Sequence, residues 1–368
     1  MATTAQVGAA IRRASQAARN AMQQLDAAAV EELVRIYTEA AEQVRGEIEA
    51  AATDGATVRL PQLRDLMARI EAVLEQLARA RDALVGAAIV RAAELGVRPL
   101  TAEGLAATGR EVEAVLDGLQ AAELVDQAVL FVREFRAEDG LVLSDRLWRT
   151  DRGARELLGR TIEQAVVQGW SADRAAQEAV LRGRPVPEGT EQAQSAARVQ
   201  NLVQAADVLR DERTGPLAAT LRVMRTEINR AHGEAYMAGA EQAPGFVGFR
   251  FLLSPMHPRP DICDLLARQN LHGLGPGVYP TRQKTPWPAH PNTLSFLVAV
   301  FEPEVTDADR AGQETTLQAL QRLAPEIREG VLGPTKAGYF DQGLLRGGMV
   351  RSTVGAVRQR LERQGRLP

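Results

Sequence analysis

The apolar residues of the N-terminal region recur at the three- and four-residue spacing of one helix face. The clearest stripe consists of Val30, Leu33, Val34, Ile36 and Tyr37. Only a helix places residues at this spacing on one side, so the pattern predicts a long amphipathic helix or a helix pair over 5–52. An Asp-Gly turn signal at 54–55 interrupts it, and a second helix is predicted over 62–95.

The middle of the chain also carries a helical pattern, with one interruption. Thr101 is expected to cap a short helix, because its hydroxyl can accept from backbone N–H groups that the first turn leaves unpaired. The stretch 127–150 breaks the helical rhythm, and its Asp-Gly pair at 139–140 predicts a hairpin or a loop. Ser144 or Asp145 is expected to cap the helix that follows.

The pattern of apolar and polar residues changes after residue 244. The stretches GFVGFRFLLS and LSFLVAVF alternate like strands, and a segment rich in Pro, Gly and His separates them. Two strands around an irregular insert predict a small α+β module near 244–302. Beyond it, the pattern returns to helix over 303–368, with helices predicted over 313–330, 338–345 and 350–364.

The predicted fold class is therefore mainly α, with one small α+β module. Five segments are expected: long N-terminal helices in 1–98, a helical middle domain in 99–184, a polar Pro- and Gly-rich linker at 185–190, the region with the module in 191–302, and a helical C-terminal tail in 303–368.

Composition agrees with a helical protein. Apolar residues make up 45% and aromatic residues 4%, and the apolar set is dominated by residues that form helices readily. A net charge of -3 does not indicate nucleic acid or an anionic membrane as a partner. Cys263 is the single cysteine, so no intrachain disulfide can form, and a reducing compartment such as a bacterial cytoplasm is expected. No run approaches the ~20 apolar residues that span a bilayer, so we expect no membrane association.

The irregular insert holds the candidate metal ligands. Three of the four histidines lie there beside the cysteine, and zinc takes about four nitrogen or sulfur donors. The candidates are His257, Cys263, His272 and His290. Their spacing matches no tight zinc motif. The alternative is that His257 and His290 hydrogen-bond to loop backbone, while Cys263 is a small buried residue at the start of a helix.

A polar network is predicted between the module and the helix before it. Its members are Arg225, Glu227, Asn229 and Asp261. Asp261 is also the expected N-cap of the helix CDLLARQN. Trp287, between two prolines, is expected to anchor a core or an interface.

These segments contain residue types that enzymes use for catalysis, but their spacing along the chain does not match a catalytic site. Cys263 with a histidine and an aspartate is the set that a thiol hydrolase uses. Glu227 and His232 could serve as an acid–base pair, yet five residues along a helix place them about 140° apart. These residues therefore do not share one face, and the sequence predicts no catalysis.

Three segments, in order, resemble the Mu-F-like head morphogenesis family of phage minor head proteins. The first is LSDRLWRT at 143–150 with QGWSADRAA at 168–176. The second is RTEINRAHGEAYMAGAEQ at 225–242, similar to the signature helix of the family. The third joins HPRPDICDLLARQN at 257–270 to PWPAHPNTLSFLVAVF at 286–301, and resembles an Asp-Cys block followed by His-Pro. The resemblance assigns the predicted module within 191–302 to this family.

The resemblance implies a structural minor head protein of a tailed bacteriophage. Such a protein is made in the host bacterial cytoplasm and lies in the head interior near the portal, where it takes part in capsid assembly and in DNA delivery. The implied partners are the portal protein and capsid subunits, with packaged DNA and further copies of the chain as additional partners. The resemblance implies no enzymatic activity.

One departure from the family bears on the metal site. Many relatives carry cysteines where this chain has Thr293 and Ser295. Two alternatives to the structural role stay open. One is a metal- or thiol-dependent hydrolase that uses the His, Cys and Asp cluster. The other is a virion protein that binds nucleic acid through the C-terminal arginines Arg351, Arg358, Arg360, Arg363 and Arg366.

Overall fold

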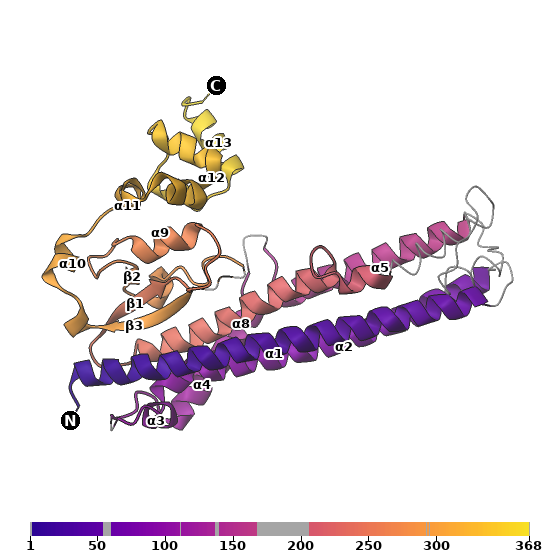
Figure 1. Cartoon of the computed structure of the whole chain (residues 1–368), viewed down its shortest axis with the longest axis horizontal. Coiled ribbons are helices and arrows are strands. Elements are labelled where there is room, and N and C mark those ends of the chain that lie inside the picture. The colour runs from indigo at the N-terminus through magenta and orange to yellow at the C-terminus, as the bar shows by residue number, and fades with distance from the viewer. Residues whose placement is uncertain are drawn as a thin grey trace. The chain divides into compact units, whose positions relative to one another are not determined.

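The computed structural model describes residues 2–53, 60–110, 112–136, 140–167, 206–291, 293 and 295–367. The chain is mainly helical and carries a small antiparallel sheet, which confirms the predicted fold class (Figure 1). The helices before the sheet are α1 (Thr4–Thr53), α2 (Leu60–Val97), α3 (Ala102–Ala106), α4 (Gly118–Glu134), α5 (Leu143–Val167) and α8 (Pro216–Ala240). The later elements are β1 (Phe246–Leu252), α9 (Ile262–Arg268), β2 (Val278–Tyr279), β3 (Phe296–Phe301), α10 (Asp307–Ala311), α11 (Thr316–Arg322), α12 (Pro325–Asp341) and α13 (Val354–Arg363).

The chain divides into two compact units. Unit 1 consists of Met1–Met22, Val90–Leu130 and Ile228–Pro368, and unit 2 consists of Gln23–Ile89 and Phe131–Glu227. The five-segment division predicted from the sequence stays a prediction. Its linker, like the motif QGWSADRAA, lies outside the described residues.

Unit 2 is built from helices that bond to one another through buried polar groups. Tyr37 of α1 shares a 2.7 Å hydrogen bond with the hydroxyl of Thr220 in α8. Arg81 of α2, of which 1% of the side chain is exposed, pairs with Asp151 of α5. Buried polar groups need such partners, because an unpaired one costs free energy. These bonds therefore fix which helix faces meet.

The sheet lies in unit 1, with strand order β2-β1-β3. The two predicted strands pair directly and antiparallel, with Phe249 opposite Ala299 and Leu252 opposite Phe296. The outer edge of β3 faces α8, where the Tyr236 hydroxyl accepts a hydrogen bond from Ala299 N at 2.9 Å. This contact satisfies a backbone donor that an open sheet edge would leave unpaired.

The C-terminal helices of unit 1 pack on α9 around a common apolar core. Its buried members include Leu265, Leu320, Leu332, Met349 and Leu361. The predicted helical tail is confirmed, but its divisions differ from those expected. A separate helix over 338–345 was expected, whereas α12 continues to Asp341 and is interrupted instead at Gly333, whose φ is 70°.

Two capping predictions can be compared with the structure. Thr101 caps α3 as expected, since its side chain accepts from Gly104 N. The expected cap of α5 at Ser144 or Asp145 was wrong, because the helix already begins at Leu143. Asp145 lies in its first turn, where its carboxylate accepts from Val142 N at 3.2 Å. The sequence predicts that the helical pattern ends at 127. This was wrong for 127–134, because α4 continues to Glu134. None of the described helices is both long and apolar enough to cross a membrane.

Candidate functional site

The candidate site is organised by the start of α9. Asp261 stands at the N-cap, where its carboxylate accepts from Cys263 N at 2.7 Å. The Asp264 carboxylate in turn accepts from Asp261 N at 3.0 Å, which completes a capping box. The predicted N-cap role of Asp261 is confirmed. The cap also fixes the first turn, so the positions of Cys263 and of both carboxylates are set together.

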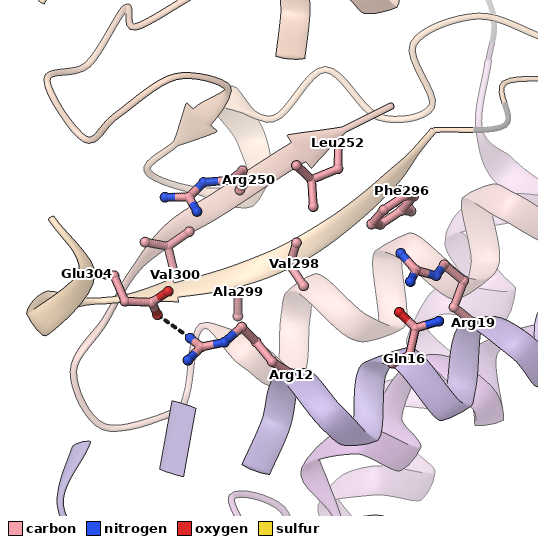
Figure 2. Close-up of a pocket in the computed structure, with 10 residues that line it drawn as sticks. All are labelled: Arg12, Gln16, Arg19, Arg250, Leu252, Phe296, Val298, Ala299, Val300 and Glu304. Atoms are coloured by element: carbon pink, nitrogen blue, oxygen red, sulfur yellow. Dashed lines mark hydrogen bonds and ion pairs between the residues drawn. The ribbon is translucent and has the colours of Figure 1, made fainter. Parts of the chain in front are cut away.

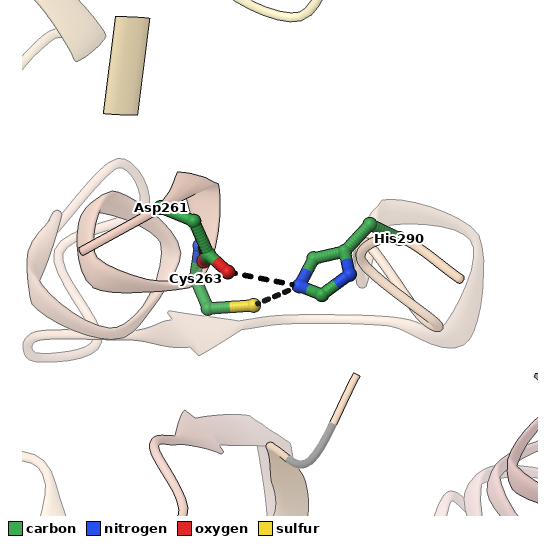
Figure 3. Close-up of side chains that lie close together, drawn as sticks. All are labelled: Asp261, Cys263 and His290. Atoms are coloured by element: carbon green, nitrogen blue, oxygen red, sulfur yellow. Dashed lines mark hydrogen bonds and ion pairs between the residues drawn. The ribbon is translucent and has the colours of Figure 1, made fainter. Parts of the chain in front are cut away.

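The thiol of Cys263 meets a histidine from a distant part of the chain. Cys263 is buried, and its Sγ lies 3.2 Å from His290 Nε2 and 3.6 Å from Thr293 Oγ1 (Figure 3). His290 Nε2 also lies 3.2 Å from Asp261 Oδ2. The imidazole nitrogen therefore faces both the sulfur and the carboxylate oxygen.

The hydrogen bond of His290 Nδ1 indicates which tautomer the neutral ring adopts. His290 Nδ1 lies 2.8 Å from the Pro291 carbonyl oxygen, which can only accept a hydrogen bond. In the neutral ring, Nδ1 therefore carries the proton and Nε2 presents a lone pair to Cys263 and Asp261. The thiol can donate to that lone pair, but a carboxylate cannot. A cation held between His290 Nε2, Cys263 Sγ and Asp261 Oδ2 would bind all three groups.

A second histidine lies on the other side of the same carboxylate. His257 Nε2 is 2.9 Å from Asp264 Oδ2 and 3.8 Å from Asp261 Oδ1. The expected bond from His257 to loop backbone is therefore replaced by contact with side-chain carboxylates. Asp261 belongs to both groups of potential ligands, Asp261–Cys263–His290 and His257–Asp261–Asp264.

The environment keeps the thiol protonated. Burial, together with the charge of Asp261, raises the pKa of Cys263 to about 11, although hydrogen bonds with Ser295 and Thr293 lower it. A thiol with this pKa carries almost no thiolate at neutral pH, and thiolate is the nucleophilic form. The cysteine is therefore a poor nucleophile, but a cation that replaces its proton can use the sulfur as a ligand.

Three of the four predicted metal ligands converge. His257, Cys263 and His290 lie around Asp261, whereas His272 belongs to neither group of potential ligands in the described part of the chain. The His272 ring packs edge-on against Tyr279, with centroids 5.9 Å apart. Its pKa is lowered by burial and by the charge of Lys284. Asp261, a carboxylate, belongs to both groups, and each group holds three residues.

The donor set suits zinc chemically. Carboxylate oxygen, thiolate sulfur and imidazole nitrogen are the groups that bind zinc, and a tetrahedral ion holds neighbouring donors about 3.3–3.8 Å apart. The donor atoms of Asp261, Cys263 and His290 lie within 4.8 Å of one another, and two of their separations are 3.2 Å. Small adjustments would bring all three onto one ion.

The predicted polar network separates into different contacts. In unit 2, Arg225 Nε lies 3.4 Å from the Asp26 carboxylate, and Glu227 accepts from Arg146 at 2.9 Å. These partners belong to α1 and α5, and not to the module. That all four residues form one network stays a prediction.

Asn229 makes a polar contact between α8 and the module, as the sequence predicts. Its side-chain amide donates to the Thr293 carbonyl at 3.2 Å, and its own carbonyl accepts from Trp287 Nε1 at 3.0 Å. The helix is therefore tied to the loop before β3 through one residue. Trp287 is confirmed as a core anchor: its ring meets that of Phe251, with centroids 6.0 Å apart.

Neither protein-family models, nor curated proteins, nor solved structures match this chain. The likeness to the head morphogenesis family accordingly rests on the sequence motifs alone.

Proposed function

We propose that this protein is a structural minor head protein of a tailed bacteriophage. It is located in the head interior near the portal, where it contributes to capsid assembly through contacts with portal and capsid subunits. The proposal rests on the resemblance of three sequence segments to one family. The observation that supports it is that two of these segments, far apart in the chain, assemble into one module.

Direct contacts join these segments in unit 1. Asn229 of the signature helix bonds to Thr293, and Trp287 bonds back to Asn229. Cys263 of the Asp-Cys block contacts His290 of the His-Pro segment. Segments that define a family by their order are expected to form a common core, and these contacts meet that expectation.

The two alternatives receive less support. A thiol hydrolase needs an accessible thiolate, whereas Cys263 is buried and has a raised pKa. A basic nucleic-acid surface needs unpaired cations, but three of the five C-terminal arginines have partners within the chain. Arg358 pairs with Glu362, and Arg351 and Arg366 donate to backbone carbonyls.

Co-expression with the portal protein encoded beside the gene tests the proposal. We expect the two proteins to co-purify and the portal of an unrelated phage not to be retained. The Cys263→Ala variant separates this role from the thiol-hydrolase alternative, because a structural role predicts no activity for the variant to lose. Failure of the wild-type chain to bind portal and capsid subunits, or an enzymatic activity lost in that variant, would contradict the proposal.

We further propose that the cluster of Asp261, Cys263 and His290 binds one zinc ion. The ion would link the first turn of α9 to the loop before β3. His290 Nε2 lies 3.2 Å from both Cys263 Sγ and Asp261 Oδ2, and a cation held between these atoms would bind all three groups. Its role would be to stabilise the module.

A further inference from the structure

A second site lies where the first turns of α1 pass over the sheet in unit 1. Arg12, Gln16 and Arg19 recur at helical spacing, so they lie on one face of α1. Arg250 of β1 and residues of β3 complete a pocket of about 360 Å³ (Figure 2). A volume of this size is typical of sites for small ligands.

The floor of the pocket is apolar. Alternate residues of a strand point to the same side of a sheet. Leu252 of β1 therefore stands beside Phe296 and Val298 of β3, and register places Leu252 directly opposite Phe296. Val300 extends this floor toward the far end. The floor would accept an apolar group while the rim supplies the charges.

The rim carries more positive than negative charge. Three guanidinium groups face a single carboxylate, that of Glu304. Arg12 is paired with Glu304, which also accepts from Phe301 N at 3.1 Å. The protein thus already holds one carboxylate of its own at this end of the pocket.

The other two arginines form no ion pair within the described residues. Arg19 lies over the ring of Phe296, 3.7 Å from its centroid, and burial lowers its pKa. Arg250 is close enough to lower the pKa of Asp309, but it makes no hydrogen bond to a described residue. The ring of Phe296 gives Arg19 a cation–π contact but no counter-charge, so this partly buried guanidinium can still bind an anion.

We propose that this pocket binds a small carboxylate that carries a compact apolar group. The carboxylate would bond to Arg19, as Glu304 bonds to Arg12, and the apolar group would cover the floor beside it. Guanidinium groups bind carboxylates through paired N–H donors, which gives the pocket its preference for such an anion. The site is separate from the Cys263 cluster and does not depend on the proposed head function.

The test uses the full chain and ligand-observed NMR titrations at low ionic strength. The probe is 3-phenylpropionate, and its neutral amide and inorganic phosphate are the comparisons. We expect the acid to bind at least tenfold more tightly than the amide, a difference of about 1.4 kcal/mol. Phosphate should bind more weakly than the acid, because it cannot use the apolar floor.

Matched variants locate the binding. Arg19→Gln should weaken binding of the acid at least tenfold. Arg13→Gln makes the same charge change on the exposed side of α1 and should leave binding unchanged. Equal binding of acid and amide, phosphate as tight as the acid, equal effects of the two variants, or no binding of the acid would each overturn the proposal. The comparison of acid with amide uses the wild-type chain, so it holds even if a variant fails to fold.

Discussion

Gly233 of α8 lies directly against the indole ring of Trp287: a Cβ atom at position 233 would be 2.0 Å from Trp287 Nε1. The same Nε1 donates to the Asn229 carbonyl at 3.0 Å. The missing side chain therefore allows the ring to reach the helix backbone, and the hydrogen bond holds it there. This contact ties the loop before β3 to α8.

Gly233→Ala should consequently destabilise the protein. The added methyl group must displace the ring, and overpacking of this kind costs about 1–3 kcal/mol. Gly46→Ala is the control, since Gly46 is an exposed helical residue with no atom within 4 Å of an added Cβ. That change should stabilise by about 0.5–1 kcal/mol. Urea unfolding followed by circular dichroism measures both. Two shifts of the same sign would contradict the packing argument.

Periodicity predicted the long elements because each has a repeating pattern. α1 and α2 follow from their apolar stripes, and β1 and β3 follow from alternation. β2 has only two residues, Val278 and Tyr279, which are too few to alternate, and it exists because β1 supplies its partners. The sequence predicts that a helix begins at Gly338, but this residue lies within α12. The helix is interrupted instead at Gly333, which has a positive φ.

The candidate site was predictable in part. Residue types identified His257, Cys263 and His290, but 27 residues separate Cys263 from His290, and no local pattern could bring them together. The two capping aspartates, Asp261 and Asp264, complete the site. Their role as caps was visible at Asp261, but their position beside the histidines depends on the fold of the insert.

The pair of Arg81 and Asp151 provides a prediction for unit 2. Arg81 is almost fully buried, and its Nη2 also lies 3.0 Å from Asp151 Oδ2. Asp151→Ala would leave this charge with the more exposed Asp82 as its partner, so we expect a loss of about 3 kcal/mol. Glu156→Ala removes the partner of Arg152 in an exposed pair on the same helix and should have little effect. Unfolding free energies of the two variants test this contrast, and similar values would refute it.

His232 predicts a loss of stability in acid. Burial of its ring lowers the pKa of His232 to about 4, and its Nε2 has no hydrogen-bond partner among the described residues. The unfolded chain, with a histidine pKa near 6.5, therefore takes up a proton before the folded chain does. His232 therefore does not lower the free energy of unfolding above pH 6.5. Between pH 6.5 and pH 4 it lowers that free energy progressively, by about 3 kcal/mol in total.

The measurement is the unfolding free energy between pH 7 and pH 4.5 for wild type and His232→Leu. The variant should show a shallower decrease, because the group that charges on unfolding is gone. His272→Gln is the comparison, since no ring nitrogen of His272 is among the buried atoms that lack a hydrogen-bond partner in the described residues. An unchanged slope in His232→Leu would show that other groups account for the acid sensitivity.

Zinc binding provides a prediction for the Cys263 cluster. The purified chain should bind one zinc ion, measured by metal analysis, and the ion should raise the free energy of unfolding. At zinc concentrations 100-fold above the dissociation constant, the gain is about 2.7 kcal/mol. Cys263→Ala and His290→Ala should abolish both effects. His272→Ala is the matched control, because this histidine lies outside the two groups of potential ligands. Affinity should increase with pH, since the ion must displace a proton from a thiol whose metal-free pKa is about 11.

Alkylation of Cys263 distinguishes this site from an adventitious one. The chain has a single cysteine, so iodoacetamide reports on that thiol alone. Burial and the raised pKa should make the reaction slow in the folded protein, and zinc should slow it further. Because the ion would occupy the sulfur directly, protection should follow the same zinc concentration as the gain in stability. Zinc that stabilises the chain without protecting the thiol, or that still binds after Cys263→Ala, would place the ion elsewhere.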